Sequence, residues 1–209
     1  MKKTILTGIL IFGVLFTSFA QMMQFGASKV ILKSGDLTKI KGEKNIKLEY
    51  DYSKMKVGAF NSEEEYVNSK VKEYNEKEKG KGDKWKQGWE DARKEKFQPK
   101  FVELFNKKVS KCGIIAVENP SKVKYTLIVK TTFTEPGYNV GIMKKPAYVN
   151  FEFFLVETDA PSTIVAELYL NNVTGYQAMG FDFDAGSRIA ESYAKGGKML
   201  GAFIAKELN

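Results

Sequence analysis

Three stretches of alternating apolar and polar residues occupy most of the chain between residues 125 and 173. Since successive side chains of a strand point to opposite faces of a sheet, each stretch predicts a strand with one apolar face. We expect the three strands to form an antiparallel meander. The positions assigned to its apolar face are Tyr125, Leu127, Val129, Thr131, Phe133, Ala147, Val149, Phe151, Phe153, Leu155, Ile164, Ala166, Leu168 and Leu170.

Shorter patterns predict further strands. Residues 45–52 alternate Ile46 and Leu48 with charged side chains, so this strand is expected to have one solvated face and to be able to join the meander. Residues 29–32 and 114–117 are short apolar runs that precede turn sequences. A sheet with one apolar face needs a cover, which the helical stretches are expected to supply.

The first helical pattern begins at Ser62. Ser62 and Glu65 have the spacing of a capping box, and the acidic residues 63–65 suit a helix N-terminus. The apolar stripe that follows is narrow and the rest of the pattern is charged. This composition predicts a peripheral helix that docks along one edge of the domain and ends by residues 80–82.

A second helical pattern follows, with Asp83 as its expected N-cap and Trp85 and Trp89 one turn apart. Pro99 is expected to kink or break this helix, because proline lacks a backbone donor and clashes with the preceding turn. Beyond it, an apolar face predicts a helix that packs on the sheet and ends at Gly113. That face consists of Phe101, Leu104, Phe105 and Val109.

The last pattern predicts a helix over about residues 187–208. Gly196, Gly197 and Gly201 lie inside it, and each interior glycine lowers helix propensity by about 1 kcal/mol relative to alanine. Close approach of this helix to the sheet or to the Phe101 helix accounts for the small residues. A membrane-spanning helix is disfavoured because lysines interrupt the apolar run.

Together these elements predict an α+β fold with a mostly antiparallel sheet. The expected order is strand, long helix, short strand, three-stranded meander and C-terminal helix, with the helices packed on one main face. We expect a single domain over residues 21–209, with residues 62–96 as a charged helical insertion.

The first twenty residues have the pattern of a cleaved signal peptide. A basic start precedes an apolar run over residues 4–17, and small residues precede Gln21. The only cysteine is Cys112, which leaves neither a lipid-anchoring cysteine after the apolar run nor an intramolecular disulfide. We therefore expect a periplasmic or secreted protein without a transmembrane segment once the signal is removed.

Composition narrows the possible chemistry. The chain has no histidine, which excludes the commonest general base and imidazole metal sites. The formal net charge is +8, with 20 basic against 14 acidic residues between positions 39 and 112. Basic and acidic residues alternate there at helical spacing, which favours a solvated helix over a nucleic-acid site. No cofactor motif is present, and we expect none and no nucleic-acid partner.

Two surfaces are candidate binding sites. The second face of the meander carries polar side chains and aromatics, unless residues 21–52 or the Ser62 helix cover it. Its candidate residues are Lys130, Tyr148, Phe154 and Tyr169.

The other surface is the loop of residues 135–146, which is too long for a tight hairpin turn. Its side chains either pack back on the sheet or insert into a partner or an anionic membrane surface. Its candidate residues are Tyr138, Val140, Ile142, Met143, Lys144 and Lys145.

Carboxylates offer a third possibility. Asp182 and Asp184 are weak candidates for a cation site, but the calcium-loop pattern is missing. The simpler interpretation is that Asp184 caps the last helix and Asp182 pairs with a lysine. We therefore predict no metal site.

The chain resembles known proteins at two levels. The residues Glu135-Pro136-Gly137-Tyr138-Asn139-Val140-Gly141, the Trp85 to Trp89 segment, and Arg188-Ile189 with Gly196-Gly197-Lys198 are similar to those of a group of secreted Gram-negative proteins of unknown function. The order of elements over residues 57–208 is similar to that of the N-terminal domains of curli-secretion-channel and TolB proteins. These resemblances imply an α+β envelope domain and supply no catalytic residue.

The sequence thus favours a non-catalytic binding or assembly protein of the envelope, acting through the open sheet face or the loop of residues 135–146. One alternative is a histidine-free hydrolase that uses carboxylates such as Glu152, Asp182 and Asp184. Another is a peripheral binder of anionic lipid or glycan, which the basic charge would attract. For the favoured binding or assembly protein, the expected partner is another protein of the envelope.

Overall fold

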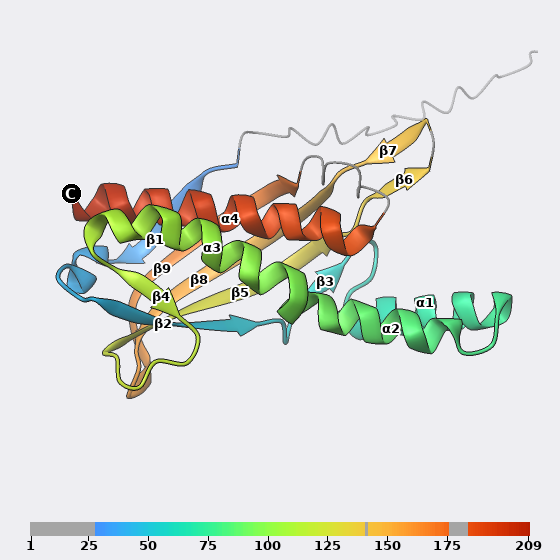
Figure 1. The fold of residues 1–209 in the computed structure, drawn as a ribbon, viewed down its shortest axis with the longest axis horizontal. Coiled ribbons are helices and arrows are strands. Elements are labelled where there is room, and N and C mark those ends of the chain that lie inside the picture. The colour runs from blue at the N-terminus through green and yellow to red at the C-terminus, as the bar shows by residue number, and fades with distance from the viewer. Residues whose placement is uncertain (1–27, 141, 176–183) are drawn as a thin grey trace, which may run out of the picture.

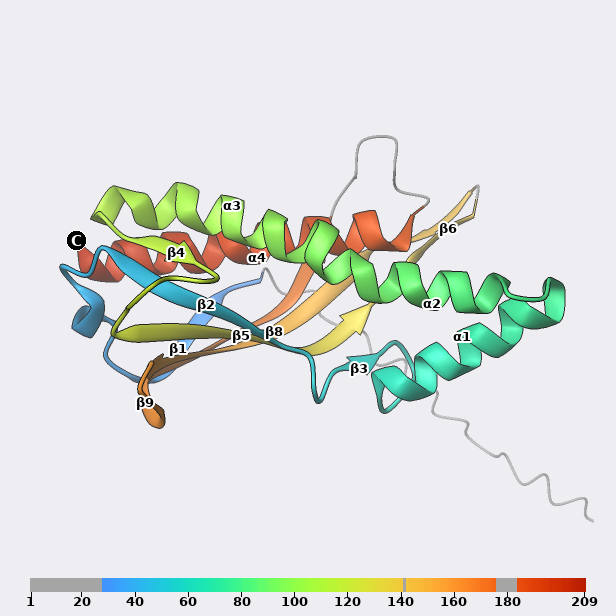
Figure 2. The ribbon, with the colours of Figure 1, turned by 60° about the horizontal axis from the view of Figure 1, so that its bottom comes forward.

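The structure is a computed structural model and describes residues 28–140, 142–175 and 184–209. A seven-stranded mixed sheet carries helices on one of its faces (Figures 1 and 2). The strands are β1 (Val30–Gly35), β2 (Asn45–Asp51), β3 (Lys56–Val57), β4 (Ile115–Val117), β5 (Tyr125–Glu135), β6 (Tyr138–Val140), β7 (Met143–Lys145), β8 (Ala147–Glu157) and β9 (Ala160–Gly175). The α-helices are α1 (Glu63–Lys77), α2 (Lys81–Ala92), α3 (Gln98–Val109) and α4 (Ala185–Leu208).

The α+β class is confirmed, and the sheet is mixed. Its order is β1-β9-β8-β5-β2-β4, with β3 paired to β5. β9 pairs antiparallel with both β1 and β8, and β8 pairs antiparallel with β5, as the meander predicts. β2 instead runs parallel to both β4 and β5. The parallel half follows from the chain order, because a helical crossover between β2 and β4 brings two strands side by side in the same direction.

The apolar face of the meander is confirmed at most positions, but two assignments are wrong. The ladder between β5 and β8 shifts register between Thr131 and Phe133, and this irregularity turns Phe133 away from the core. Its ring stacks on Tyr148 at 5.3 Å, while Thr134 is buried in its place. Ile164 is 54% exposed, because register shifts between the end of β8 and the beginning of β9 reverse the alternation there.

The cover over the apolar face comes from α3 and α4, which lie side by side on the sheet (Figure 2). The Phe101 ring of α3 meets the Phe153 ring at 6.2 Å, and Tyr193 of α4 meets Phe151 edge-on at 5.0 Å. Close approach explains the interior glycines. A Cβ on Gly197 would lie 2.2 Å from the backbone oxygen of Phe101.

A kink or a break was expected at Pro99, and the helical segment continues there without a break. A π-helical turn over Arg93–Phe97 joins α2 directly to α3. The Gln98 amide bonds to the Arg93 carbonyl one residue further back than in an α-helix, and Pro99 then lies in the first turn of α3. A wider turn of this kind accommodates the missing proline donor without ending the helix.

The charged insertion forms an antiparallel pair of helices, α1 and α2, that extends beyond the sheet (Figure 1). Ser62 is the N-cap of α1 as predicted, since its Oγ accepts a hydrogen bond from the Glu65 amide at 3.1 Å. The N-cap of α2 is Gly80, so Asp83 lies in its first turn instead. The narrow stripe of α1 packs on α2, with the Tyr66 and Trp89 rings 5.1 Å apart, rather than along the edge of the sheet.

Candidate functional site

The loop of residues 135–146 is a two-stranded hairpin, β6–β7, that projects from the body (Figure 1). Val140 pairs with Met143 at its end, and these side chains are 59% and 60% exposed. Ile142, at the turn, is fully exposed. The side chains at the tip therefore do not pack back on the sheet, which was the alternative interpretation of this loop.

The base of the hairpin is fixed by the body of the protein. The guanidinium of Arg188, which is 8% exposed, donates to the carbonyl oxygens of Pro136 and Gly137 at 3.1–3.2 Å. The Glu135 carboxylate accepts from the Gly137 amide at 3.0 Å and from Lys145 Nζ at 2.6 Å. These contacts hold the arm in one direction and neutralise the charge of Lys145.

Glycine is required at the start of the arm. Gly137 has a φ of +63°, and a Cβ there would lie 2.3 Å from the Lys145 carbonyl oxygen. A side chain would force apart the two strands at the point where the hairpin leaves the sheet. The geometry of this base therefore depends on Gly137 and on Arg188, which lies 51 residues further along the chain.

The second face of the sheet carries no helix within the described part of the chain (Figure 2). Residues 30–35 and 45–51, which were a possible cover, are strands of the sheet itself, and α1 lies beyond it. At the centre of this face Lys130 pairs with Glu152 at 3.0 Å and lies 5.6 Å from the centre of the Phe154 ring. Tyr169 faces Glu152 from the neighbouring strand.

The charges on this face are matched across the strands. Lys33 of β1 pairs with Glu167 of β9 at 2.8 Å, and Asp51 lies opposite Lys130. Pairs of opposite charge across neighbouring strands are typical of a solvated sheet face. Tyr148 is 7% exposed beneath Phe133, so this candidate residue has little surface left for a ligand.

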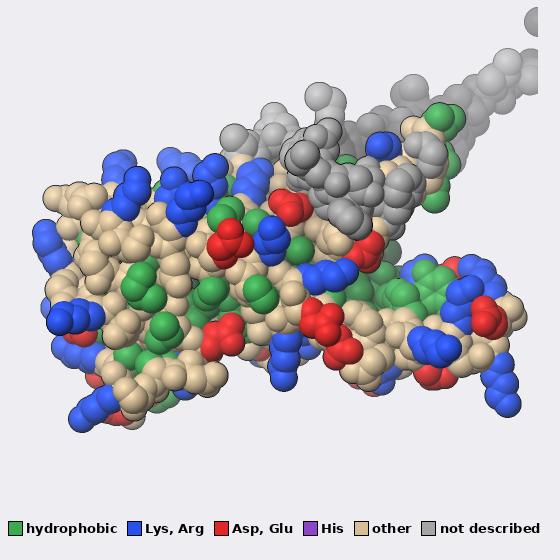
Figure 3. Space-filling model, viewed as in Figure 1, with side chains coloured by type: hydrophobic (Ala, Val, Ile, Leu, Met, Phe, Trp, Pro, Cys, Tyr) green, Lys and Arg blue, Asp and Glu red, His purple; other side chains and the backbone are tan. Residues whose placement is uncertain are grey.

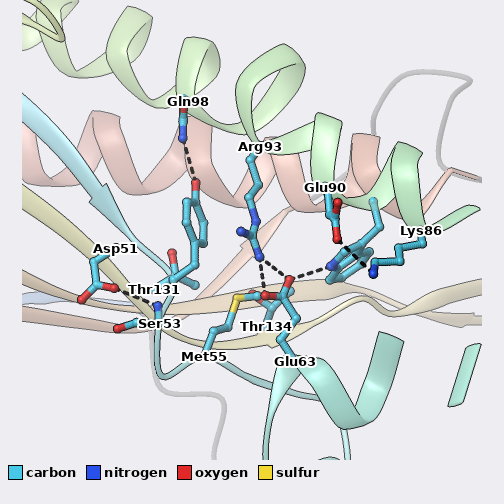
Figure 4. A network of polar contacts seen from close by, with 12 residues as sticks. Asp51, Ser53, Met55, Glu63, Lys86, Glu90, Arg93, Gln98, Thr131 and Thr134 are labelled. Carbon is cyan, nitrogen blue, oxygen red and sulfur yellow. Dashed lines mark hydrogen bonds and ion pairs between the residues drawn. The ribbon is translucent and has the colours of Figure 1, made fainter. Parts of the chain in front are cut away.

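A polar cluster that the sequence patterns did not predict lies where the two-helix insertion meets the sheet (Figure 4). Arg93 donates to both carboxylate oxygens of Glu63, and the Trp89 indole donates to the same carboxylate at 2.7 Å. The Arg93 guanidinium also lies 4.2 Å from the centre of the Tyr52 ring. This cluster ties α1, α2 and the end of β2 together.

Two open pockets flank this ion pair. One of about 690 Å³ lies between the Tyr52 to Lys56 turn and the start of α1, and one of about 300 Å³ lies between α1 and α2. Glu63, Glu64 and Arg93 line both pockets. Glu63 and Arg93 bind each other, so their charges are already matched. We therefore interpret the pair as a structural joint that connects the two-helix insertion to the sheet.

The Glu63 and Arg93 pair and the Arg188 contacts at the hairpin base are two structural joints, and both involve a residue type that is rare in this chain. Of the 33 basic residues only Arg93 and Arg188 are arginine, and the rest are lysine. A guanidinium has a rigid fork of donors that suits partly buried contacts with several acceptors, whereas lysine suits solvated surfaces. Both arginines lie at such joints, one at the two-helix insertion and one at the β6–β7 hairpin.

Asp184 has the structural role that the sequence favoured. Its carboxylate caps α4 by accepting from the Gly186 and Ser187 amides at 3.1 and 3.0 Å, and it pairs with Lys96 at 2.6 Å. Burial alone would raise the pKa of this carboxyl, but these donors outweigh it and lower the pKa to about 2. Asp182 lies outside the described residues.

Within the described ranges, no cluster of three or more acidic or cysteine side chains is placed to hold a metal ion. Over the same ranges, no helix is both long and apolar enough to cross a membrane. The predicted signal peptide, residues 1–20, lies outside the part of the chain that the structure describes.

Comparisons with known proteins give little. No family model matches the chain, and no curated protein does. Among solved structures, the PelC dodecamer from Paraburkholderia phytofirmans is 14% identical with a TM-score of 0.35, covering 80% of this chain and 96% of that one. A DUF330 protein from Xanthomonas campestris is 13% identical with a TM-score of 0.31, over 50% and 61% of the two chains. Likenesses this low carry no functional argument.

Proposed function

We propose that this chain is a non-catalytic binding protein of the cell envelope or its exterior, and that it docks through the β6–β7 hairpin. The observation that carries the proposal is the exposed apolar tip, Val140, Ile142 and Met143, on an arm whose base is fixed by Arg188. Large exposed apolar side chains gathered on a projecting element are typical of an interaction site. The location is inferred from the signal-peptide pattern of residues 1–20.

The hairpin is the better supported of the two candidate surfaces. On the open sheet face the charged side chains are already paired with one another, and Lys130 is largely covered, at 22% exposure. A partner would have to displace these pairs to bind there. At the hairpin tip, burial of the three apolar side chains would itself favour binding, and it would break none of their described interactions.

The enzyme alternative finds less support. Glu152 lies on the open face in an ion pair, whereas Asp184 lies at the start of α4 on the helical side of the sheet. These two carboxylates therefore do not share a site. Asp182, the third candidate, is outside the described residues.

Co-sedimentation of the purified protein with isolated envelopes of its host tests the proposal. The variant carries Ile142→Ser and Met143→Ser. The matched control carries Ile31→Ser and Ile164→Ser, which remove exposed isoleucines, at 39% and 54%, from the sheet strands. We expect envelope binding to fall for the hairpin variant and to persist for the control. Equal binding of both variants would contradict the proposal, and loss in the control alone would assign binding to the sheet.

A further inference from the structure

The tip of the hairpin is the one place in the described chain where large exposed apolar side chains adjoin. Four of the seven such residues, Tyr138, Val140, Ile142 and Met143, fall within six consecutive positions. The other three, Ile31, Ile115 and Ile164, lie on separate strands. In Figure 3 hydrophobic side chains gather at the end of the hairpin.

The side chains along the hairpin are ordered by polarity. Ile142 lies at the turn, followed by the pair of Val140 and Met143, then by Asn139 and Lys144, and then by Tyr138 and Lys145. At about 3.4 Å per residue, the paired rungs span about 7 Å, with the turn beyond them. The apolar end is therefore separated from a tyrosine and two lysines by about one to three residues.

This order matches the depth profile of a lipid bilayer. Interfacial elements bury their apolar side chains about 5–10 Å into the headgroup and acyl boundary. Tyrosine is enriched at the headgroup level, and basic side chains near the surface are attracted to anionic lipid. A groove on a protein would need to match one side of the arm, whereas a bilayer accommodates apolar groups all around its end.

The charge of the whole chain favours an anionic surface. The formal net charge is +8, or +6 without the two lysines of the predicted signal peptide, and lysines gather along α4 at the upper edge of the view in Figure 3. Lys198 and Lys206 of this helix are exposed. Such a field draws the protein toward anionic lipid over roughly a Debye length, about 10 Å at 0.1 M salt.

We infer that the β6–β7 hairpin is a wedge for anionic lipid bilayers, with Ile142, Val140 and Met143 entering the acyl boundary and Lys144 at the headgroups. The inference rests on the proposed function and names the chemistry of its target. Because the wedge is short, binding is weak and reversible. Replacing one of its large apolar side chains by serine weakens partition about tenfold.

Vesicle binding tests the inference with the predicted mature chain, from Gln21 onward, because a retained signal segment would itself insert into lipid. Vesicles of phosphatidylcholine are compared with vesicles that also contain phosphatidylglycerol. We expect binding to the anionic vesicles, weakened about tenfold by Ile142→Ser, lowered by Lys144→Gln and by salt, and unchanged by Ile164→Ser.

A second measurement reports depth without depending on affinity. In a Cys112→Ser background, an environment-sensitive fluorophore on Ile142→Cys should shift to shorter wavelength on anionic vesicles, and the same label on Ile164→Cys should not. The lipid inference is overturned if the protein does not bind the vesicles, or if Ile142→Ser leaves vesicle binding unchanged. If hairpin-dependent binding to native envelopes persists in that case, the target is a protein and the proposed function stands. If the hairpin variant also leaves envelope binding unchanged, both the lipid inference and the proposed function are wrong.

Discussion

Replacing Gly197 by alanine tests how α4 packs on α3. In an ordinary helix interior this substitution stabilises by about 1 kcal/mol through helix propensity. Here the added Cβ would lie 2.2 Å from the Phe101 carbonyl oxygen and 3.0 Å from the Phe101 carbonyl carbon. Both atoms belong to backbone, which cannot move aside as a flexible side chain can, so the two helices must separate.

The magnitude follows from the two opposing effects. Overpacking typically costs about 1–3 kcal/mol, and a clash with backbone belongs at the upper end. Subtracting about 1 kcal/mol of propensity leaves a net loss of about 2 kcal/mol in the free energy of unfolding.

Gly88→Ala is the matched control. Gly88 is an exposed interior position of α2, and a Cβ added there would have no atom within 4 Å, so the same change should stabilise by up to about 1 kcal/mol. Urea denaturation measures the free energy of unfolding of both variants. A shift of the denaturation midpoint reports a change in stability if the dependence of that free energy on urea concentration is unchanged. If Gly197→Ala were as stable as Gly88→Ala, the close approach of α3 and α4 would be refuted.

Three further predictions follow from named contacts. Glu63→Gln should lower the free energy of unfolding by about 1–3 kcal/mol in urea denaturation, because it leaves the partly buried Arg93 without its counter-charge; Glu64→Gln, at an exposed neighbouring position, should change it little. Asp184 has a lowered pKa, so its contribution is present above about pH 4 and is lost as pH falls toward 2; Asp184→Asn should flatten this acid loss, and an unchanged pH profile would contradict the assignment. Asn106→Ala should cost about 1–3 kcal/mol and promote association at high concentration, because the Asn106 amide pairs with both backbone groups of Ala116 and closes the sheet edge at β4; a variant that associates no more than the unaltered protein by light scattering would count against this role.

The fold was predictable where local pattern decides it. Alternation over residues 147–155 assigned β8 correctly, since all five inward positions are at most 2% exposed. The small residues of α4 correctly indicated close approach to the sheet and to α3, as Gly196 lies against Phe151 and Gly201 against Phe105. In both cases the period of the side chains and their size are local properties of the sequence.

Other features depend on partners distant in sequence. The irregularity that turns Phe133 outward depends on the pairing of β5 with β8, and no sequence pattern within β5 predicts it. The parallel direction of β2 depends on where the helical crossover returns the chain. A strand, a helical segment and a second strand in that order is the pattern of a parallel pair, and giving it more weight would have predicted the mixed sheet.

The candidate hairpin could be found from its length and composition, but its direction could not. Whether the side chains of residues 138–145 pack back or project depends on Arg188 and Gly137, whose contact spans 51 residues. Likewise the Glu63 and Arg93 pair spans 30 residues. The rarity of arginine in a lysine-rich chain was the available signal for both joints.

The most direct test of the account is the envelope co-sedimentation of the Ile142→Ser and Met143→Ser double variant beside its sheet-strand control. Each apolar side chain removed from a buried contact is worth about 1.5–3 kcal/mol, so two together should weaken binding by at least about a hundredfold. The account predicts that the hairpin variant remains in the supernatant while the control sediments with the envelopes. Sedimentation of the hairpin variant at the level of the unaltered protein would contradict it.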